Sequence, residues 1–151
     1  MKAVAVIGSA AFVGVMLTIG VGLGAFFILS DPGVFEQWFA DYFVFLVLPV
    51  FMTSVPAFVG TIAMLRRSEK GSPARSLWRV ALIGLVVSYA ITAVIHLPLN
   101  IAFWSFTLSD DDITRNLAIW MIAHVARIVA ALIGATYAYR AVVGSTATTA
   151  A

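Results

Sequence analysis

LAIWMIAHVARIVAALIGATYAY, which spans residues 117–139, is an apolar run that contains one histidine and one arginine. A helix needs about 20 residues to cross the hydrocarbon core of a bilayer, and this run is long enough. Lipid offers no hydrogen bonds to the backbone, so a segment of this kind satisfies its own polar groups as a helix. The stretch therefore predicts a membrane-spanning helix that carries His124 and Arg127 in its interior.

Three similar runs precede it, at about 3–29, 42–65 and 80–107. The chain has 151 residues, of which 62% are hydrophobic and only 11% are charged, and its mean hydropathy is +1.05. A soluble domain averages about 25% charged residues, so this composition favours a bilayer as the solvent. Short connections place consecutive spans antiparallel. We therefore predict an all-α integral membrane protein, a four-transmembrane-helix up-down antiparallel bundle over residues 1–140, with a flexible cytoplasmic tail at 141–151.

The charged residues divide between alternate connections. Acidic residues follow the first and third spans, with Glu69 and Arg115 as the exceptions to the pattern. The basic residues gather at the other ends: Lys2, Arg66, Arg67, Lys70, Arg75, Arg79 and Arg140. Short loops rich in lysine and arginine stay in the cytoplasm, so we predict a multi-pass protein with both termini cytoplasmic. The first run is longer than the apolar part of a signal peptide, so it is predicted to be a retained span.

Two connections carry local signals. After a turn predicted at residues 31–33, a group of aromatic residues is typical of an interfacial belt, with a short amphipathic lid as the alternative. These residues are Phe35, Trp38, Phe39, Tyr42 and Phe43. Before the fourth span, Ser109 and Asp112 have the spacing of a capping box, which predicts a helix start there.

The third span places its polar residues on one arc. At about 100° per residue, Ser88, Tyr89, Thr92, His96 and Asn100 all fall on one side of a helix. Lipid cannot satisfy these groups, so the arc must face other helices or a cavity. For Ser88 and Thr92 we favour hydrogen bonds that hold the helices together. For His96 and Asn100 together we favour a functional role.

The fourth span presents a matching face. Asn116, Trp120, His124 and Arg127 are spaced by four, four and three positions, which puts them on one side of a helix. Arg127 lies roughly 15 Å from the outer end of the span, and no acidic residue is predicted at that depth. Backbone carbonyls, water or a ligand anion must serve it instead. A purely structural alternative satisfies Arg127 with Asn100 and with carbonyls such as the one that Pro98 leaves free.

The polar faces of the third and fourth spans lie at matching depths in the predicted bilayer. Asn100 and His124 each lie roughly 10 Å below the outer end, and His96 and Arg127 lie deeper. We therefore predict one shared pocket whose catalytic residues are His124, Arg127, Asn100 and His96. Its substrate-binding residues are predicted to be Trp120, Trp104, Tyr89 and Thr53, with the two tryptophans as a roof. Pro49 and Pro56 in the second span are expected to kink that helix and widen the cavity.

The sequence also limits the cofactors and partners. His96 and His124 could hold haem or a metal ion, but the chain has no cysteine and no carboxylate is predicted nearby, so no cofactor is expected. The net charge is only +2 and no basic tract carries interleaved aromatics, so no nucleic acid partner is predicted. The predicted partners are the lipid bilayer, a hydrophobic small molecule and O₂, and a homo-oligomer is compatible with the sequence.

One motif resembles a known family. HLPLN at residues 96–100, followed by the W-x3-H-x2-R pattern of Trp120, His124 and Arg127, is similar to a broad four-helix membrane family that includes the fungal anthrone oxygenases. The specific part of the resemblance covers residues 96–127. The resemblance implies a four-helix membrane bundle and oxygenation of an anthrone to an anthraquinone without a cofactor. It also implies that Asn100, Trp120, His124 and Arg127 are the functional set.

The side chains of the predicted pocket could perform this chemistry, independently of the family resemblance. A histidine beside Arg127 in an apolar pocket should favour its neutral form, which can act as a general base on an acidic CH₂ group. Arg127 and Asn100 can stabilise the enolate oxygen that results. An electron-rich carbanion can reduce O₂ directly. The sequence therefore predicts a cofactor-independent oxygenase that acts on a hydrophobic aromatic or polyketide substrate.

Two alternatives remain open at this point. The same base and oxyanion site would serve an isomerase or cyclase on a polyketide-type substrate. A non-catalytic membrane protein that binds a lipid, quinone or pigment would also need a polar intramembrane pocket. A carrier is less favoured because the chain lacks the repeats and paired broken helices of transporters.

Overall fold

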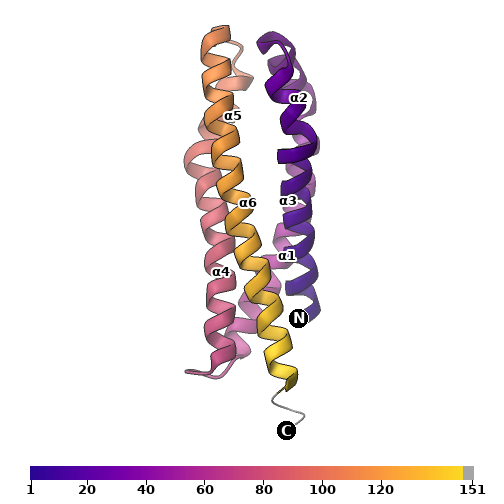
Figure 1. Ribbon diagram of the computed structural model, residues 1–151, viewed down its shortest axis with the longest axis vertical. Helices are drawn as coiled ribbons and strands as arrows, with labels where there is room; N and C mark the ends of the chain where they lie inside the picture. The colour runs from indigo at the N-terminus through magenta and orange to yellow at the C-terminus, as the bar shows by residue number, and fades with distance from the viewer. Residues whose placement is uncertain (148–151) are drawn as a thin grey trace.

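The computed structural model describes the backbone of residues 1–147 and the side chains of residues 1–144, and within this range the chain is helical with no strand. Its elements run along one common long axis, and α1 begins at the same end of the molecule at which α6 finishes (Figure 1). The elements are α1 (Lys2–Leu17), η1 (Thr18–Leu23), α2 (Gly24–Leu29), α3 (Pro32–Arg67), α4 (Pro73–Ile91), η2 (Thr92–His96), α5 (Leu97–Trp104) and α6 (Asp110–Ala147).

Four helical runs are long and apolar enough to cross a membrane: Lys2–Leu29, Pro32–Arg67, Pro73–Trp104 and Asp110–Gly144. Their outer faces carry many large apolar side chains in the open, such as Ile122 at 73% exposure. Water would make a surface of this kind prone to association, whereas lipid solvates it. The fold is therefore consistent with the predicted multi-pass membrane protein.

The helices are longer than the predicted spans. α3 begins at Pro32 and α4 at Pro73, which suits proline because its fixed φ and missing N–H are tolerated in a first helical turn. α6 continues to Ala147, past the predicted end of the fourth span at 139. The predicted flexible tail therefore begins inside a helix, and its last part, residues 148–151, lies outside the described residues.

The prediction of an interfacial aromatic belt was wrong for Phe35 and Phe39. Both are 1% exposed, because α3 is already helical there and turns these two positions inward. Their rings pack edge-on against Phe103, with centroids 5.0 and 5.5 Å apart. Phe27 from α2 lies against Phe35 at 5.4 Å. These four rings form a cluster, which we call the aromatic plug, at the end of the bundle where α5 joins α6.

Glycines bring the helices together in two close pairs. A Cβ added at Gly8 of α1 would lie 2.6 Å from the backbone nitrogen of Ala57 in α3. One added at Gly84 of α4 would lie 2.6 Å from the carbonyl oxygen of Ala130 in α6. Only a residue without a side chain allows such close packing of backbones. The pairs α1–α3 and α4–α6 are therefore the tightest parts of the molecule.

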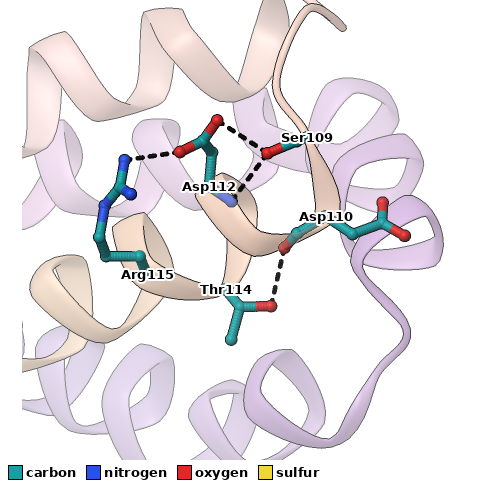
Figure 2. Close-up of polar contacts among 5 residues, drawn as sticks. All are labelled: Ser109, Asp110, Asp112, Thr114 and Arg115. Carbon is teal, nitrogen blue, oxygen red and sulfur yellow. Dashed lines mark hydrogen bonds and ion pairs between the residues drawn. The ribbon is translucent and has the colours of Figure 1, made fainter.

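A capping box fixes the start of α6, as predicted from Ser109 and Asp112 (Figure 2). The backbone N–H of Asp112 donates to Ser109 Oγ at 3.2 Å, and that hydroxyl donates to Asp112 Oδ2 at 2.8 Å. Arg115 Nη2 donates to the other carboxylate oxygen at 2.6 Å. These contacts set where α6 begins.

Candidate functional site

A cavity of about 350 Å³ lies between α3, the α4–η2–α5 run and α6, which is within the size range of small-molecule sites. Most of its wall is apolar, and its polar groups come mainly from η2, α5 and α6. The lining residues are Ile19, Phe43, Leu46, Val47, Val50, Phe51, Tyr89, Thr92, Ala93, His96, Leu97, Asn100, Trp120, His124 and Arg127.

All four predicted catalytic residues line this one cavity and all are buried. His96 is 1% exposed, His124 0%, Arg127 6% and Asn100 8%. Two predicted substrate-binding residues, Trp120 and Tyr89, line it as well. The structure therefore brings together six of the eight residues that the sequence assigned to the site.

The remaining two, Trp104 and Thr53, do not line the cavity. Trp104 is 54% exposed at the end of α5 and packs against Phe43, with ring centroids 5.8 Å apart. The hydroxyl of Thr53 donates to the carbonyl of Pro49 one turn earlier, at 2.8 Å, and so is used within its own helix. The expectation that Trp104 roofs the pocket was wrong, because α5 turns that ring toward the outside.

Trp120 orients the amide of Asn100. Its indole Nε1–H donates to Asn100 Oδ1 at 2.9 Å, which joins α6 to α5. An indole N–H can only donate, so the amide oxygen must face it and the NH₂ group remains as a donor. The indole also stacks on the imidazole of His124, with centroids 5.0 Å apart and planes within 7°. Trp120 therefore holds a hydrogen-bond donor and an imidazole in fixed positions.

The tautomer of His124 follows from its partner. Its Nε2 lies 2.9 Å from the carbonyl oxygen of Met16 on α1, and a carbonyl can only accept. Nε2 therefore carries the hydrogen in the neutral ring, and Nδ1 keeps a free lone pair. Nδ1 is buried and has no hydrogen-bond partner among the described residues. Gly20 makes room for this ring, since a Cβ there would lie 2.9 Å from His124 Cδ2.

His96 completes an aromatic wall. Its ring meets the edge of Trp120 at 4.8 Å and lies 5.9 Å from the ring of His124. Its Nδ1 has a long contact of 3.5 Å with the carbonyl oxygen of Ile91, and its Nε2 has no hydrogen-bond partner among the described residues. Two imidazoles, each with an unpaired nitrogen, therefore contact each other and the same indole.

Arg127 is a buried cation that has no counter-ion in the part of the chain that the structure describes. Within residues 1–144, neither Asn100 nor any backbone carbonyl accepts a hydrogen bond from its guanidinium, and Nε is buried without a partner. The structural alternative considered from sequence, in which Asn100 and free carbonyls satisfy Arg127, is therefore not realised. An unpaired buried charge is costly, which makes an intramembrane arginine of this kind a functional candidate.

Tyr89 is held from the opposite side of the cavity. Its hydroxyl forms a hydrogen bond with the Oγ of Ser54 on α3, and Ser54 is fully buried. The ring of Tyr89 packs between Phe58 and Phe12, at 5.2 and 6.1 Å. The pairing of Ser54 with Tyr89 could not be predicted from the sequence, because a contact between two spans leaves no trace in the residue spacing of either span.

Two π-helical turns flank the site, and sequence reasoning missed both. η2 carries Thr92, Ala93 and His96, and it ends at His96, two residues before Pro98. Proline lacks an N–H and its ring clashes with the carbonyl four residues earlier, here that of Val94, so a wider turn relieves the crowding. η1 lies in the glycine-rich segment TIGVGL and carries Ile19. Pro98 and the glycines were the available signals.

Metal ligands are sparse around the pocket. Among the described residues, no three His, Cys, Asp or Glu side chains gather into a group that could hold a metal ion. A metal in this cavity would rely on the two imidazoles alone, next to the positive charge of Arg127. The residues present therefore fit an anionic or oxygen-bearing organic ligand better than a cation.

Comparison with known proteins assigns no family: no protein-family model matches the chain, and no curated protein or solved structure is significantly similar to it. The cavity itself offers an unpaired guanidinium, an imidazole lone pair and an amide donor, all buried in an otherwise apolar space.

Proposed function

We propose that the protein is a membrane enzyme that deprotonates a hydrophobic aromatic substrate and lets the resulting enolate react with O₂, without a cofactor. The observation that carries this proposal is the buried, unpaired guanidinium of Arg127 in the same cavity as the free lone pair of His124. As His124 removes a proton from the substrate, the electron pair left behind develops as negative charge on a substrate oxygen, and that anionic oxygen would give the cation its partner.

His124 is the proposed general base. Its Nε2–H is held by the Met16 carbonyl, so Nδ1 is the nitrogen that is free to take a proton. As Nδ1 becomes protonated, the Met16 carbonyl continues to accept from Nε2 and stabilises the imidazolium. His96 is a second candidate base, because its Nε2 is also buried and unpaired.

Arg127 and Asn100 form the proposed oxyanion site. The NH₂ group of Asn100 is left as a donor because Trp120 occupies the amide oxygen. Donors that are already oriented in a dry cavity stabilise charge that appears in the transition state more strongly than water does. The cavity contributes little other polarity, so the substrate oxygen would be drawn to these two groups.

The proposed reaction balances with O₂ alone. An anthrone-type CH₂ group loses one proton to the base, and the enolate transfers electrons to O₂ as a carbon–oxygen bond forms. The hydroperoxide then loses water to leave a carbonyl. The carbon is oxidised by four electrons, one oxygen atom of O₂ becomes the new carbonyl and the other becomes water. No external reductant is needed.

The resemblance of residues 96–127 to the anthrone oxygenase family supports the same proposal. That resemblance implies a functional set of Asn100, Trp120, His124 and Arg127, and these four side chains line one cavity. An isomerase or cyclase would use the same base and oxyanion site, but it would consume no O₂. A protein that only binds a lipid, quinone or pigment would bind without turnover.

The proposal includes a membrane setting. Contacts between α1 and α3 pair low residue numbers with high ones, as in Ala5 with Gly60 and Gly8 with Ala57, which supports an up-down antiparallel bundle. The connection between α3 and α4 carries basic residues such as Arg67 and Lys70. By the positive-inside rule, we propose that this connection and both termini are cytoplasmic.

O₂ uptake by the purified protein in detergent, with an anthrone as substrate, tests the reaction. We expect one O₂ consumed per quinone formed, with the same rate after treatment with a chelator. His124→Gln keeps a donor for the Met16 carbonyl but has no base, so the rate should fall by about 10²–10⁴-fold. Val125→Ala, a change at a neighbouring exposed position of α6, is the matched control and should keep the rate. Equal rates for His124→Gln and the parent would rule out this assignment.

A further inference from the structure

The cavity reaches the outer surface of the bundle at the side, between helices. We infer that its ligand arrives sideways from the hydrocarbon layer of the bilayer, through a gap between α3 and the η2–α5 run, and that the ligand is a flat aromatic molecule with an acidic oxygen at its leading edge. This inference rests on the proposed function for its membrane setting and for the role of Arg127.

Exposure of the lining residues changes across the cavity. Phe51 on α3 is 52% exposed and Leu97 on α5 is 54% exposed, although both line the cavity, and Ala93 on η2 is also exposed. His124 and Arg127 on the α6 wall are 0% and 6% exposed. The cavity therefore runs from a surface that lipid would cover to an interior wall that carries the polar groups.

The end of the bundle nearest the α5–α6 connection is closed. The aromatic plug of Phe27, Phe35, Phe39 and Phe103 is at most 1% exposed. It joins the cavity directly, because Phe43, a lining residue, stacks on Phe39 at 4.7 Å. A ligand from the water on that side would have to separate rings that are in contact along the bundle axis.

The opposite end is closed as well. Tyr89 is held between Phe12 and Phe58 and is tied to Ser54. Below it, the backbones of α4 and α6 approach so closely at Gly84 that an added Cβ would lie 2.8 Å from the Cα of Gly134. With both ends filled, the side gap is the path that needs the least rearrangement of the described residues.

The distribution of polar atoms determines which part of a ligand enters first. The gap is framed by apolar side chains, whereas the unpaired nitrogens of His96, His124 and Arg127 lie inside. An oxygen that carries or develops negative charge would pair with these atoms, and the rest of the molecule would remain in the apolar part. The rings of Trp120, Phe43 and Phe51 suit a flat aromatic body rather than an acyl chain.

Narrowing the gap tests the path. Ala93→Trp would place a large ring at its edge, and Ala90→Trp places the same ring at an exposed position one turn earlier that does not line the cavity. The probe is 1,8-dihydroxyanthraquinone, and its binding to protein in lipid nanodiscs is followed by quenching of tryptophan fluorescence. Ala93→Trp should slow association and dissociation alike, by about tenfold, because mutants of one site commonly differ in rate by one to three decades. Ala90→Trp should match the parent.

Should Ala93→Trp fail to fold, Leu97→Trp with Val94→Trp as its control makes the same comparison, since Leu97 lines the cavity and the exposed Val94 does not. Diluting the probe with extra lipid at a fixed total concentration gives a second measurement. The association rate should follow the mole fraction of probe in the lipid. Association rates that change neither with a tryptophan at the gap nor with the amount of added lipid would overturn lateral access.

The two proposals fail separately in these experiments. O₂ uptake with an anthrone is measured on the same nanodiscs. Uptake that persists while Ala93→Trp changes nothing would overturn the lateral path and leave the reaction standing. Probe binding that depends on the gap, without O₂ uptake in the parent protein, would overturn the reaction and leave the path standing.

Discussion

Arg127 is a charged residue that is buried although its guanidinium has no hydrogen-bond or ion-pair partner among the described residues. A central arginine in a membrane helix costs at least about 2.5–3.5 kcal/mol on insertion scales, and among the described residues no hydrogen bond or ion pair to Arg127 offsets that cost. A residue that only held the fold together would have a partner within the fold. Arg127 has none among the described residues, although His96, His124 and Asn100 line the same cavity.

Arg127→Met should therefore make the protein more stable and inactive. Methionine removes an unpaired buried charge and retains an unbranched apolar stem, so the free energy of unfolding should rise by about 1–3 kcal/mol, within the insertion cost of a central arginine. Thermal unfolding in detergent measures the stability, and O₂ uptake with an anthrone measures the activity. A variant that loses stability together with turnover would indicate a structural role for Arg127 instead.

At the scale of the element, glycines decide how closely the helices approach. Gly84 faces the backbone of α6, whereas a Cβ added at Gly14 of α1 would meet nothing within 4 Å. The two positions share a residue type and a helical conformation but differ in what surrounds them. They therefore separate the effect of packing from the effect of helix propensity.

Gly84→Ala should destabilise the protein by about 1–3 kcal/mol, because the added methyl group meets backbone atoms that can move only if α4 and α6 separate. Gly14→Ala should be neutral or slightly stabilising, since alanine favours a helix over glycine. Both are measured by thermal unfolding in detergent. A similar loss in the two variants would mean that propensity, and not helix contact, sets the result.

The π turn at η2 is the element that places His96. Pro98→Ala restores a backbone N–H and removes the ring clash, which allows the turn to return to α-helical geometry. That return would rotate His96 relative to α5 by about 100°, the angle of one residue. We expect turnover to fall while thermal stability is kept or improved. Full turnover would show that the position of His96 does not matter.

At the scale of the element, the sequence predicted the helices well but predicted the contacts between them only in part. Hydropathy located the four apolar runs, and helical spacing on two runs placed His96, Asn100, Trp120, His124 and Arg127 around one cavity. Trp104 and Thr53 were also assigned to the pocket but do not line it, because the sequence of one helix does not reveal how that helix is rotated against its neighbours. The bond from His124 to Met16, and hence the tautomer, depends on a contact between distant segments that no local pattern encodes.

At the scale of the whole molecule, the charge pattern makes a prediction about orientation. The chain has no cysteine, so single cysteines can be introduced as unique labels. Thr107→Cys lies in the connection before α6 and Lys70→Cys in the connection before α4, and both positions are exposed. A maleimide that cannot cross membranes should label Thr107→Cys in intact cells and Lys70→Cys only after lysis. The opposite result would invert the proposed topology.

The four long runs form a closed ring of neighbours in which α1 contacts α3 and α6, and α4 contacts α3 and α6. The bond between His124 and Met16 lies where α1 meets α6, and the gap at Phe51 and Leu97 lies on the other side, where α3 faces η2 and α5. A hinge-like motion about the contact between α1 and α6 would therefore separate α3 from η2 and α5 the most and would move His124 the least. Ligands of different width could then enter at the gap while the imidazole of His124 keeps its position. The protein would accept ligands that differ in width but would still require the same acidic group next to His124.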